Sequence, residues 1–359
     1  MLQSRIQNSM RKKAVSQKEK ILIAGAGGYI GSVMTKYLLE KGYMVIALDR
    51  FFFGEETLGD CTQHENLLIL KEDTRFFDKK ILKDVNIVID LSGLSNDPSA
   101  ELNPSLTKSI NIDGCIRLAE LSKQMNVERY IFASSCSVYG EGKGVMLTEE
   151  SELNPITLYA KAKVVVEQKL LNLVSNDFAV TITRNATCFG VSPRMRFDLA
   201  INTMTLSAYK NNIIHVNGGG KQWRPFIHIL DVVKAFERVL LTPRHIINKQ
   251  IFNIGSNEQN FQLFELAKKI QYLFPKCELN IQSSSDESRN YNVNFDKAAK
   301  ILEFLPKITV ADGVQEIKTA LEKMTVATDI KTITVNFYKY LIEADIIIQK
   351  IKYNNVLFL

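Results

Sequence analysis

The 359-residue sequence lacks the long apolar runs of a membrane protein. No run approaches the roughly 20 residues of a transmembrane helix, and the longest candidates, such as residues 85–91, have the length of buried strands. The first 20 residues are polar and basic, without the apolar segment of a secretory signal. We therefore expect a cytoplasmic protein that binds no membrane, with residues 1–19 as a polar tail.

The sequence also has few cysteines and a small net charge. The five cysteines form no CxxC motif and no Cys/His cluster; they are Cys61, Cys115, Cys136, Cys188 and Cys277. Their scatter argues against a zinc site and against a disulfide framework, and it fits a reducing compartment. The formal charge of +6 is small for this length, and a basic tail is usually a solvated extension. We expect no bound metal and no nucleic-acid partner.

From Lys20 onward, short apolar strands alternate with segments of helical periodicity. The predicted strands lie near residues 20–25, 43–48, 67–70, 85–91, 128–134 and 179–184. The predicted helices lie near residues 29–41, 104–125 and 156–175. This alternation predicts an α/β fold, a Rossmann-type doubly wound parallel sheet with helices on both faces.

The pattern becomes less regular after about residue 190. Shorter segments follow, punctuated by Pro, Gly and Asn, which indicates a smaller C-terminal lobe with some chain returning to the first. We expect a Rossmann domain over 20–190, the smaller lobe mainly over 191–330, and a helix with a tail over 331–359. Apolar residues at helical spacing in 333–351 predict that last helix.

A glycine-rich turn follows the first predicted strand. The strand 21–24 runs directly into Gly25-Ala26-Gly27-Gly28-Tyr29-Ile30-Gly31. Glycines allow a tight turn and let backbone N–H groups approach a pyrophosphate at a helix N-terminus. In this strand–turn–helix context we predict a dinucleotide site that includes Gly25, Gly28, Tyr29, Ile30 and Gly31.

Acidic residues end the next two strands. Asp49 lies eighteen positions after Gly31, where an acid suits the ribose hydroxyls of NAD and would repel the extra phosphate of NADP. Arg50 is adjacent and leaves NADP as an alternative. Asp73, followed by Thr74, could meet the adenine, or it could cap a turn. We predict NAD as the cofactor, with these four residues near it.

Tyr159 and Lys163 lie one helical turn apart. A phenol with an ordinary pKa of about 10 is a poor base near neutrality. A lysine ammonium on the same helix face favours the phenolate by opposite-charge stabilisation. The spacing therefore makes Tyr159 a candidate proton-transfer group.

Four motifs together resemble the extended short-chain dehydrogenase/reductases that act on nucleotide sugars, the epimerase/dehydratase branch. The resemblance covers roughly residues 20 to 320. The motifs are Gly25-x-x-Gly28-x-x-Gly31, Asn111 within 110–114, Ser-Ser-Cys-Ser-Val-Tyr-Gly at 134–140, and Tyr159-x-x-x-Lys163. It implies a Rossmann domain with NAD and a C-terminal lobe that binds a nucleoside-diphosphate sugar, and a homodimer is the family expectation.

The resemblance also implies roles for single residues. Ser135 matches the hydroxyl that binds the reacting sugar oxygen, Tyr159 matches the base, and Lys163 matches its partner, which would also bind the nicotinamide ribose. Arg224 and Arg289 match two arginines that bind the sugar diphosphate. Asn202 is a further candidate at the diphosphate, and Arg194 and Arg196 could line the same cleft. Asn111 matches a structural asparagine, and we expect His228 to be a buried, hydrogen-bonded residue.

The sequence departs from the 4,6-dehydratase pattern at Cys136 and Ser137. Dehydratases of the family typically carry an Asp-Glu pair there, and neither residue offers the carboxylates that the elimination needs. We therefore expect a nucleotide-sugar epimerase acting at C4. A dehydrogenase or 4-ketoreductase remains the alternative, and a dehydratase or a non-catalytic NAD-binding protein is less favoured.

Overall fold

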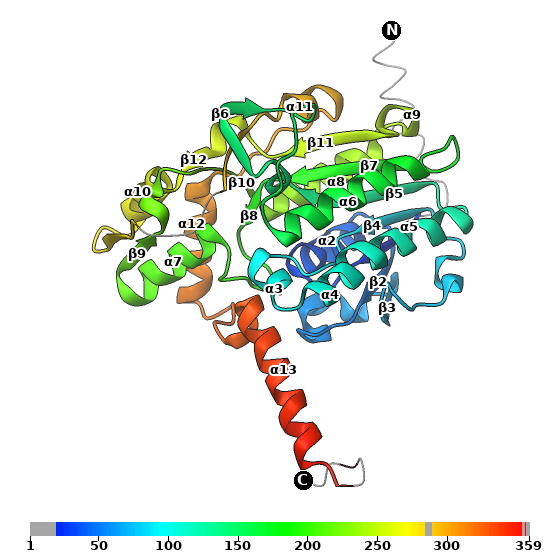
Figure 1. Cartoon of the computed structure of the whole chain (residues 1–359), viewed down its shortest axis with the longest axis horizontal. Coiled ribbons are helices and arrows are strands. Elements are labelled where there is room, and N and C mark those ends of the chain that lie inside the picture. Colours follow the sequence, from blue (N-terminus) through cyan, green and yellow to red (C-terminus); the bar gives the residue numbers. More distant parts are fainter. Residues whose placement is uncertain (1–18, 284–288, 354–355, 357–359) are drawn as a thin grey trace.

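The computed structural model describes residues 19–283, 289–353 and 356. A parallel sheet with the strand order β11-β7-β5-β4-β1-β2-β3 forms the centre of the larger lobe (Figure 1). The strands are β1 (Lys20–Ala24), β2 (Met44–Asp49), β3 (Leu67–Lys71), β4 (Ile87–Asp90), β5 (Arg129–Ser135), β7 (Ala179–Asn185) and β11 (Gln250–Ile254). The predicted Rossmann-type α/β class is confirmed.

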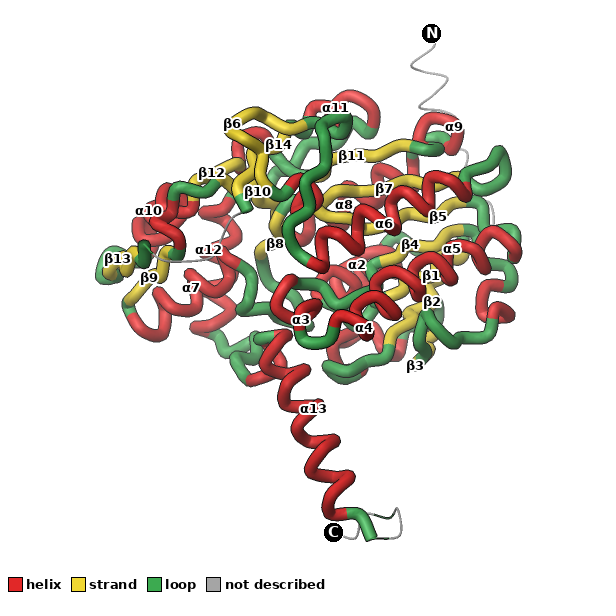
Figure 2. Tube along the Cα trace, in the orientation of Figure 1, coloured by secondary structure: helices red, strands yellow, loops and turns green. Residues whose placement is uncertain are grey.

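Helices cover both faces of this sheet (Figure 2). One face packs against α2 (Tyr29–Glu40) and α8 (Ile229–Leu241), and the other against α5 (Cys115–Gln124) and α6 (Leu158–Leu173). The central strands are therefore buried on both sides, which explains why they read as continuous apolar runs rather than alternating ones.

Two features of the larger lobe add detail to the sequence prediction. The seventh strand, β11, comes from residues 250–254 and pairs in parallel with β7, so the return of the chain that was expected adds an edge strand. The predicted helix over 104–125 divides into α4 (Pro104–Thr107), a π-helical turn (Lys108–Gly114) and α5. Asn111 lies in that turn, where its side chain binds both backbone polar groups of Leu94.

The smaller lobe combines three longer helices with short sheets. Phe189, Phe226 and Leu266 are fully buried in its core. Its longer helices are α7 (Ala200–Asn211), α10 (Leu263–Leu273) and α12 (Val310–Glu322). The paired strands are β8 (Thr187–Phe189), β10 (Trp223–His228) and β12 (Asn260–Gln262); β9 (Ile213–Val216) and β13 (Glu278–Ile281); β6 (Glu141–Leu147) and β14 (Asn290–Val293). The remaining short helices are α3 (Asp97–Glu101), α9 (Arg244–Ile247) and α11 (Asp296–Ile301).

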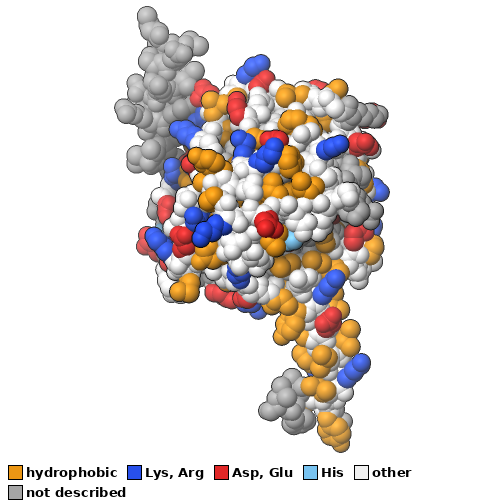
Figure 3. Space-filling view, turned by 90° about the vertical axis from the view of Figure 1, so that its left-hand side faces the viewer, with side chains coloured by type: hydrophobic (Ala, Val, Ile, Leu, Met, Phe, Trp, Pro, Cys, Tyr) orange, Lys and Arg blue, Asp and Glu red, His pale blue; other side chains and the backbone are white. Residues whose placement is uncertain are grey.

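The last helix, α13 (Thr334–Ile351), confirms the predicted C-terminal helix. Its first turns pack against the body, and the rest projects away from it (Figure 1). The projecting part exposes large apolar side chains, seen as orange atoms on the lower projection in Figure 3: Tyr340, Ile342, Ile346, Ile347 and Ile351. Among the helices that the structure describes, α13 included, none has the length and apolarity to cross a membrane.

Candidate active site

A cavity of about 590 Å³ opens where the strand order reverses between β1 and β4. Ligands of doubly wound sheets bind at this point, beyond the carboxyl ends of the strands. The larger lobe contributes the glycine-rich turn and the ends of its central strands. The smaller lobe contributes side chains such as Arg224, Arg289 and Tyr291, so the cavity lies between the two lobes.

The glycine-rich turn has the backbone approach that a pyrophosphate requires. Gly25 has a φ of +83°, and a Cβ there would meet the Leu91 carbonyl oxygen at 2.8 Å. A Cβ on Gly31 would lie 2.1 Å from the Gly25 carbonyl oxygen, so only glycine lets α2 start this close to β1. The turn and the start of α2 then face the cavity through Gly28, Tyr29 and Ile30. Exposed amide groups at a helix N-terminus fit the pyrophosphate of NAD.

Asp49 is held at the edge of the cavity by backbone donors. Its carboxylate accepts hydrogen bonds from the amides of Gly27 (3.0 Å) and Phe51 (2.7 Å). Burial nevertheless raises the pKa of Asp49 above its ordinary value, with these amides opposing the shift. The fixed carboxylate suits the ribose hydroxyls of NAD. Arg50 is exposed, with its guanidinium 5.5 Å from the centre of the Phe52 ring.

Asp73 and Thr74 also line the cavity. The Asp73 carboxylate binds the Arg75 guanidinium through two hydrogen bonds of 2.9 and 2.7 Å, and it accepts a third from the Arg75 amide. The capping role considered for Asp73 is thus present in the structure. Its contact with the adenine stays a prediction.

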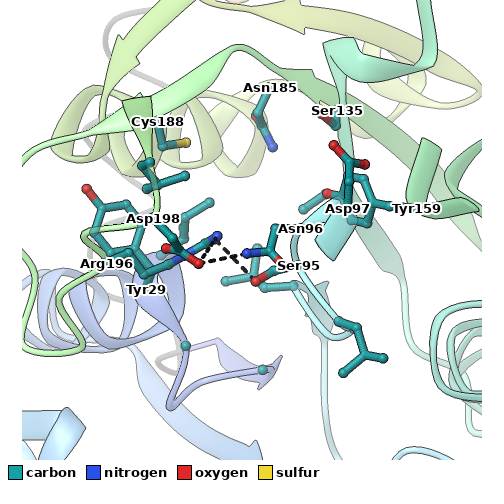
Figure 4. Close-up of a pocket in the computed structure, with 18 of the residues that line it drawn as sticks. Tyr29, Ser95, Asn96, Asp97, Ser135, Tyr159, Asn185, Cys188, Arg196 and Asp198 are labelled. Carbon is teal, nitrogen blue, oxygen red and sulfur yellow. Dashed lines mark hydrogen bonds and ion pairs between the residues drawn. The ribbon is translucent and has the colours of Figure 1, made fainter. Parts of the chain in front are cut away.

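The three predicted catalytic residues line the same cavity. Ser135 ends β5, while Tyr159 and Lys163 lie on the first turns of α6, which begins at the N-cap Thr157. The Lys163 ammonium donates to the Ala133 carbonyl at 2.7 Å and lies 5.7 Å from the centre of the Tyr159 ring. Figure 4 shows Ser135 and Tyr159 on one side of the cavity. The fold thus joins residues that are 28 positions apart in sequence.

The electrostatics around Tyr159 only partly match the prediction. Burial raises the pKa of Tyr159 above its ordinary value, and the nearby Asp97 carboxylate adds to the rise. Lys163 and Arg196 lower the pKa, as expected for cations, but the net shift is upward. The described side chains alone therefore do not produce a phenolate near neutrality. Bound NAD in its oxidised form would add a third positive charge beside the phenol.

A buried ion pair fixes the catalytic helix to the sheet. The Glu167 carboxylate, one turn beyond Lys163, binds the Arg184 guanidinium of β7 at 2.8 Å. Glu167 also accepts a 2.5 Å hydrogen bond from the Ser134 hydroxyl, next to Ser135. Both members of the pair are almost fully buried. This contact sets the position of α6, and so of Tyr159, relative to the end of β5.

Arg224 and Arg289 approach one another in the part of the cavity wall that the smaller lobe supplies. The Arg224 guanidinium lies 5.0 Å from the centre of the Tyr291 ring and donates to the Arg289 carbonyl oxygen. Arg289 pairs with the Asp97 carboxylate, whose other oxygen accepts from the Thr157 hydroxyl. The two arginines lie close together in the cavity wall, as the diphosphate hypothesis requires.

The prediction that Asn202 binds the diphosphate is wrong in this structure. Its side chain is fully buried and does not line the cavity. The Asn202 oxygen accepts from the Gly190 amide at 3.1 Å, and its nitrogen donates to the Tyr29 hydroxyl and the Arg196 carbonyl. Tyr29 in turn donates to the Gly190 carbonyl at 2.6 Å. Asn202 therefore joins the two lobes and holds the Tyr29 side chain in place.

Arg196 lines the cavity, as predicted, but its partners form a polar network opposite Tyr159 that sequence reasoning missed (Figure 4). The Arg196 guanidinium binds the Asp198 carboxylate at 2.9 Å and the Ser95 hydroxyl at 3.2 Å. Asn96 donates to the same Asp198 carboxylate at 2.7 Å. Residues 95–98, which include Asp97, reach the site because β4 ends beside β1. The sequence signal is the position of this segment directly after a predicted strand, where ligands of doubly wound sheets bind.

The remaining candidates occupy supporting positions. Cys136 is buried, its thiol lies 3.2 Å from the Arg184 carbonyl, and burial raises the pKa of Cys136 far above its ordinary value. A buried thiol with a raised pKa is a poor nucleophile. His228 is buried, accepts from the Leu230 amide and meets the Glu316 carboxylate at 2.8 Å, as predicted for a hydrogen-bonded histidine.

Solved structures share this fold. A UDP-glucuronic acid 4-epimerase from Bacillus cereus, solved with UDP-glucuronic acid and NAD, superposes with a TM-score of 0.77 at 23% identity. The match covers 85% of this chain and 99% of that one. At this identity the likeness concerns the fold.

Two sequence relatives cover most of the chain. An uncharacterized UDP-glucose epimerase of Bacillus subtilis is 28% identical over 309 residues, 82% of this chain and 95% of the relative. UDP-glucuronic acid decarboxylase 4 of Arabidopsis thaliana is 26% identical over 325 residues, 87% of this chain and 71% of the relative. The family model "NAD dependent epimerase/dehydratase family" matches residues 21–255. The chain therefore belongs to the NAD-dependent epimerase/dehydratase family and is an enzyme that uses NAD.

Proposed function

We propose that the protein is an epimerase that inverts C4 of a nucleoside-diphosphate sugar through a 4-keto intermediate. The observation that carries the proposal is the arrangement of one cavity. Ser135, Tyr159 and Lys163 line it together with the glycine-rich turn, and Arg224 and Arg289 line the end that the smaller lobe forms. A sugar anchored by its diphosphate at that end would extend toward Tyr159.

The residues in the cavity fit NAD, and different residues would bind its different parts. The turn over 25–31 would hold the pyrophosphate, Asp49 the ribose hydroxyls of the adenosine, and Lys163 the nicotinamide ribose. Bound NAD supplies the hydride acceptor for oxidation of the sugar carbon. The protein must then orient the sugar and move one proton.

Tyr159 would accept the proton of the C4 hydroxyl. Ser135 would donate a hydrogen bond to the same oxygen as it becomes a carbonyl, and the Lys163 ammonium would stabilise the phenolate. The Tyr159 phenol would then return the proton to the oxygen at C4. Tyr159, Ser135 and Lys163 thus finish the cycle in the protonation states in which they began, with no net oxidation of the sugar.

The anchoring of the substrate favours inversion at C4. Arg224 and Arg289 would hold the diphosphate, which is joined to C1 of the sugar, by charge-assisted hydrogen bonds. C4 lies across the ring from C1. Turning the ring about the bond to the diphosphate therefore keeps C4 near Tyr159 and presents its opposite face. The name of the Bacillus subtilis relative, a UDP-glucose epimerase, supports this choice and makes UDP the first nucleotide to test.

A panel of UDP-hexoses, UDP-hexuronic acids and UDP-N-acetylhexosamines, incubated with purified protein and NAD, tests the proposal. Chromatography of the sugars and absorbance at 340 nm are followed together, with Tyr159→Phe as the matched control. We expect one sugar to give its C4 epimer without net NADH. Stoichiometric formation of NADH with a keto product would instead identify a dehydrogenase. The homodimer expected from the family resemblance stays a prediction.

A further inference from the structure

The first turns of α13 form part of the cavity wall on the cofactor side. Val335 and Tyr338 line the cavity beside Phe52 and Phe53, which follow β2. The Tyr338 ring centre lies 5.6 Å from that of Phe53 and 6.3 Å from that of Phe52. This segment lies outside the 21–255 range that the family model matches.

Arg194 is a buried cation in the same wall. Only 4% of it is exposed, and its guanidinium lies 3.7 Å from the centre of the Phe53 ring. It donates to the Met195 carbonyl and to the Thr334 hydroxyl of α13, each at 2.9 Å. Both acceptors are neutral, and among the described residues no carboxylate forms an ion pair with Arg194; Asp198 and Asp49 act on it only from farther away. Burial, helped by the Arg196 charge, lowers the pKa of Arg194 to about 10.

Asp198 already pairs with Arg196, and Asp49 is held by backbone amides. Because a buried guanidinium with no carboxylate in direct contact is costly, this site favours an anionic ligand. The chain holds Arg194 against the start of α2. The Ser192 hydroxyl donates to the Tyr29 carbonyl at 2.8 Å and lies 3.0 Å from the Ser32 hydroxyl. The Arg194 amide donates to that same Ser192 hydroxyl at 3.2 Å. The backbone of Arg194 therefore lies beside the first turn of α2, and its guanidinium lines the same cavity as the glycine-rich turn, whereas Arg224 and Arg289 line it from the smaller lobe.

Several contacts tie the start of α13 to both sides of this wall. The Thr332 carbonyl accepts from the Phe197 amide at 2.8 Å, and the Thr334 amide donates to the Asp198 carboxylate at 3.2 Å. Lys331 binds the Glu56 carboxylate at 3.0 Å, next to the Phe52–Phe53 loop. The segment thus bridges the loop after β2 and the loop before α7.

We propose that residues 330–340 form a cofactor-retaining strap, in which Thr334 holds Arg194 on the NAD pyrophosphate and Tyr338 covers the adenosine side. The strap goes beyond the proposed epimerisation, because it depends only on NAD as the cofactor. It is a binding element supplied from beyond the part of the chain that the family model matches.

Calorimetric titration of the full chain, freed of bound cofactor, tests the strap. The probes are NAD, ADP-ribose and, for the sugar end, UDP. Losing a hydrogen bond to a charged group, worth about 1.5–3 kcal/mol, corresponds to a roughly 10- to 100-fold loss of affinity. We expect Arg194→Met to weaken NAD and ADP-ribose by this factor and to leave UDP within about twofold. Tyr338→Ala should also weaken NAD, whereas Ile347→Ala, at a residue 57% exposed on the projecting part of α13, should not.

Two outcomes would overturn the strap. If Arg194→Met and Tyr338→Ala both bind NAD with wild-type affinity, residues 330–340 do not retain the cofactor. If Arg194→Met loses affinity for UDP alone, Arg194 binds the substrate instead. Thermal melting monitors folding, and if Arg194→Met does not fold, Thr334→Val and Tyr338→Ala decide the question alone. A wild-type protein that binds NAD but epimerises no sugar would refute the proposed function and leave the strap standing.

Discussion

Removing the Lys163 charge is the sharpest test of how Tyr159 becomes a base. Burial and Asp97 hold the pKa of Tyr159 above its ordinary value, and Lys163 is the first of the two cations that oppose this rise. Lys163→Met keeps the length of the side chain and deletes the ammonium. We therefore expect the pKa of Tyr159 to rise further, and the active phenolate to form only at higher pH.

The geometry gives the size of the effect. With the ammonium 5.7 Å from the ring centre, an effective dielectric constant of about 20 gives about 3 kcal/mol of attraction. That energy equals about two pKa units. Since the phenolate fraction falls tenfold per unit below the pKa, the rate at pH 7 should fall roughly 100-fold, and much of it should return near pH 10.

The assay is the pH dependence of sugar turnover at saturating NAD, from pH 6 to pH 10. Lys161→Met, on the same helix but exposed, is the matched control and should keep the wild-type profile. A Lys163→Met enzyme that loses activity equally at every pH would refute the electrostatic role. The residue would then act only by binding the nicotinamide ribose or the Ala133 carbonyl.

Three further changes address catalysis, the cofactor turn and the support of the site. Tyr159→Phe should lower kcat by about 10²- to 10⁴-fold while calorimetry finds unchanged NAD affinity; equal turnover would remove Tyr159 from the mechanism. Gly31→Ala places a Cβ 2.1 Å from the Gly25 carbonyl, so we expect lost NAD binding and a lower melting temperature, and a wild-type titration would contradict this. Glu167→Gln leaves Arg184 charged and buried, which should lower the urea-measured free energy of unfolding by about 3–5 kcal/mol; a loss below 1 kcal/mol would refute that estimate.

The features that could be predicted from the sequence are those that a local pattern of residues determines. Strand–turn–helix order placed Gly25 and Gly31 in the turn that the structure has, because their conformation and close packing admit no side chain. The i, i+4 spacing placed Tyr159 and Lys163 on one helix face. Ser135 could be added only through the resemblance, since no local rule links a strand end to a helix that begins more than twenty residues later.

The sequence could not predict contacts that depend on how the lobes meet. The amide of Asn202 could bind a diphosphate. In the fold, however, α7 is oriented so that this side chain contacts Tyr29 and Gly190 instead. Asp97 lacks a local signature, and it reaches Tyr159 only because α3 packs beside α6. Tyr338 is more than 280 residues from Phe53 in the chain, so periodicity could give its helix but not the cavity that it lines.

The fate of hydrogen at C4 tests the central claim most directly. A nucleotide sugar deuterated at C4, identified from the panel, is converted by the enzyme with NAD in ordinary water, and the product is examined by mass spectrometry and NMR. Transfer to the cofactor and back predicts a C4 epimer that retains the deuterium, without net NADH. Loss of deuterium to solvent would contradict the account, because inversion would then proceed by proton exchange at carbon and not by hydride transfer.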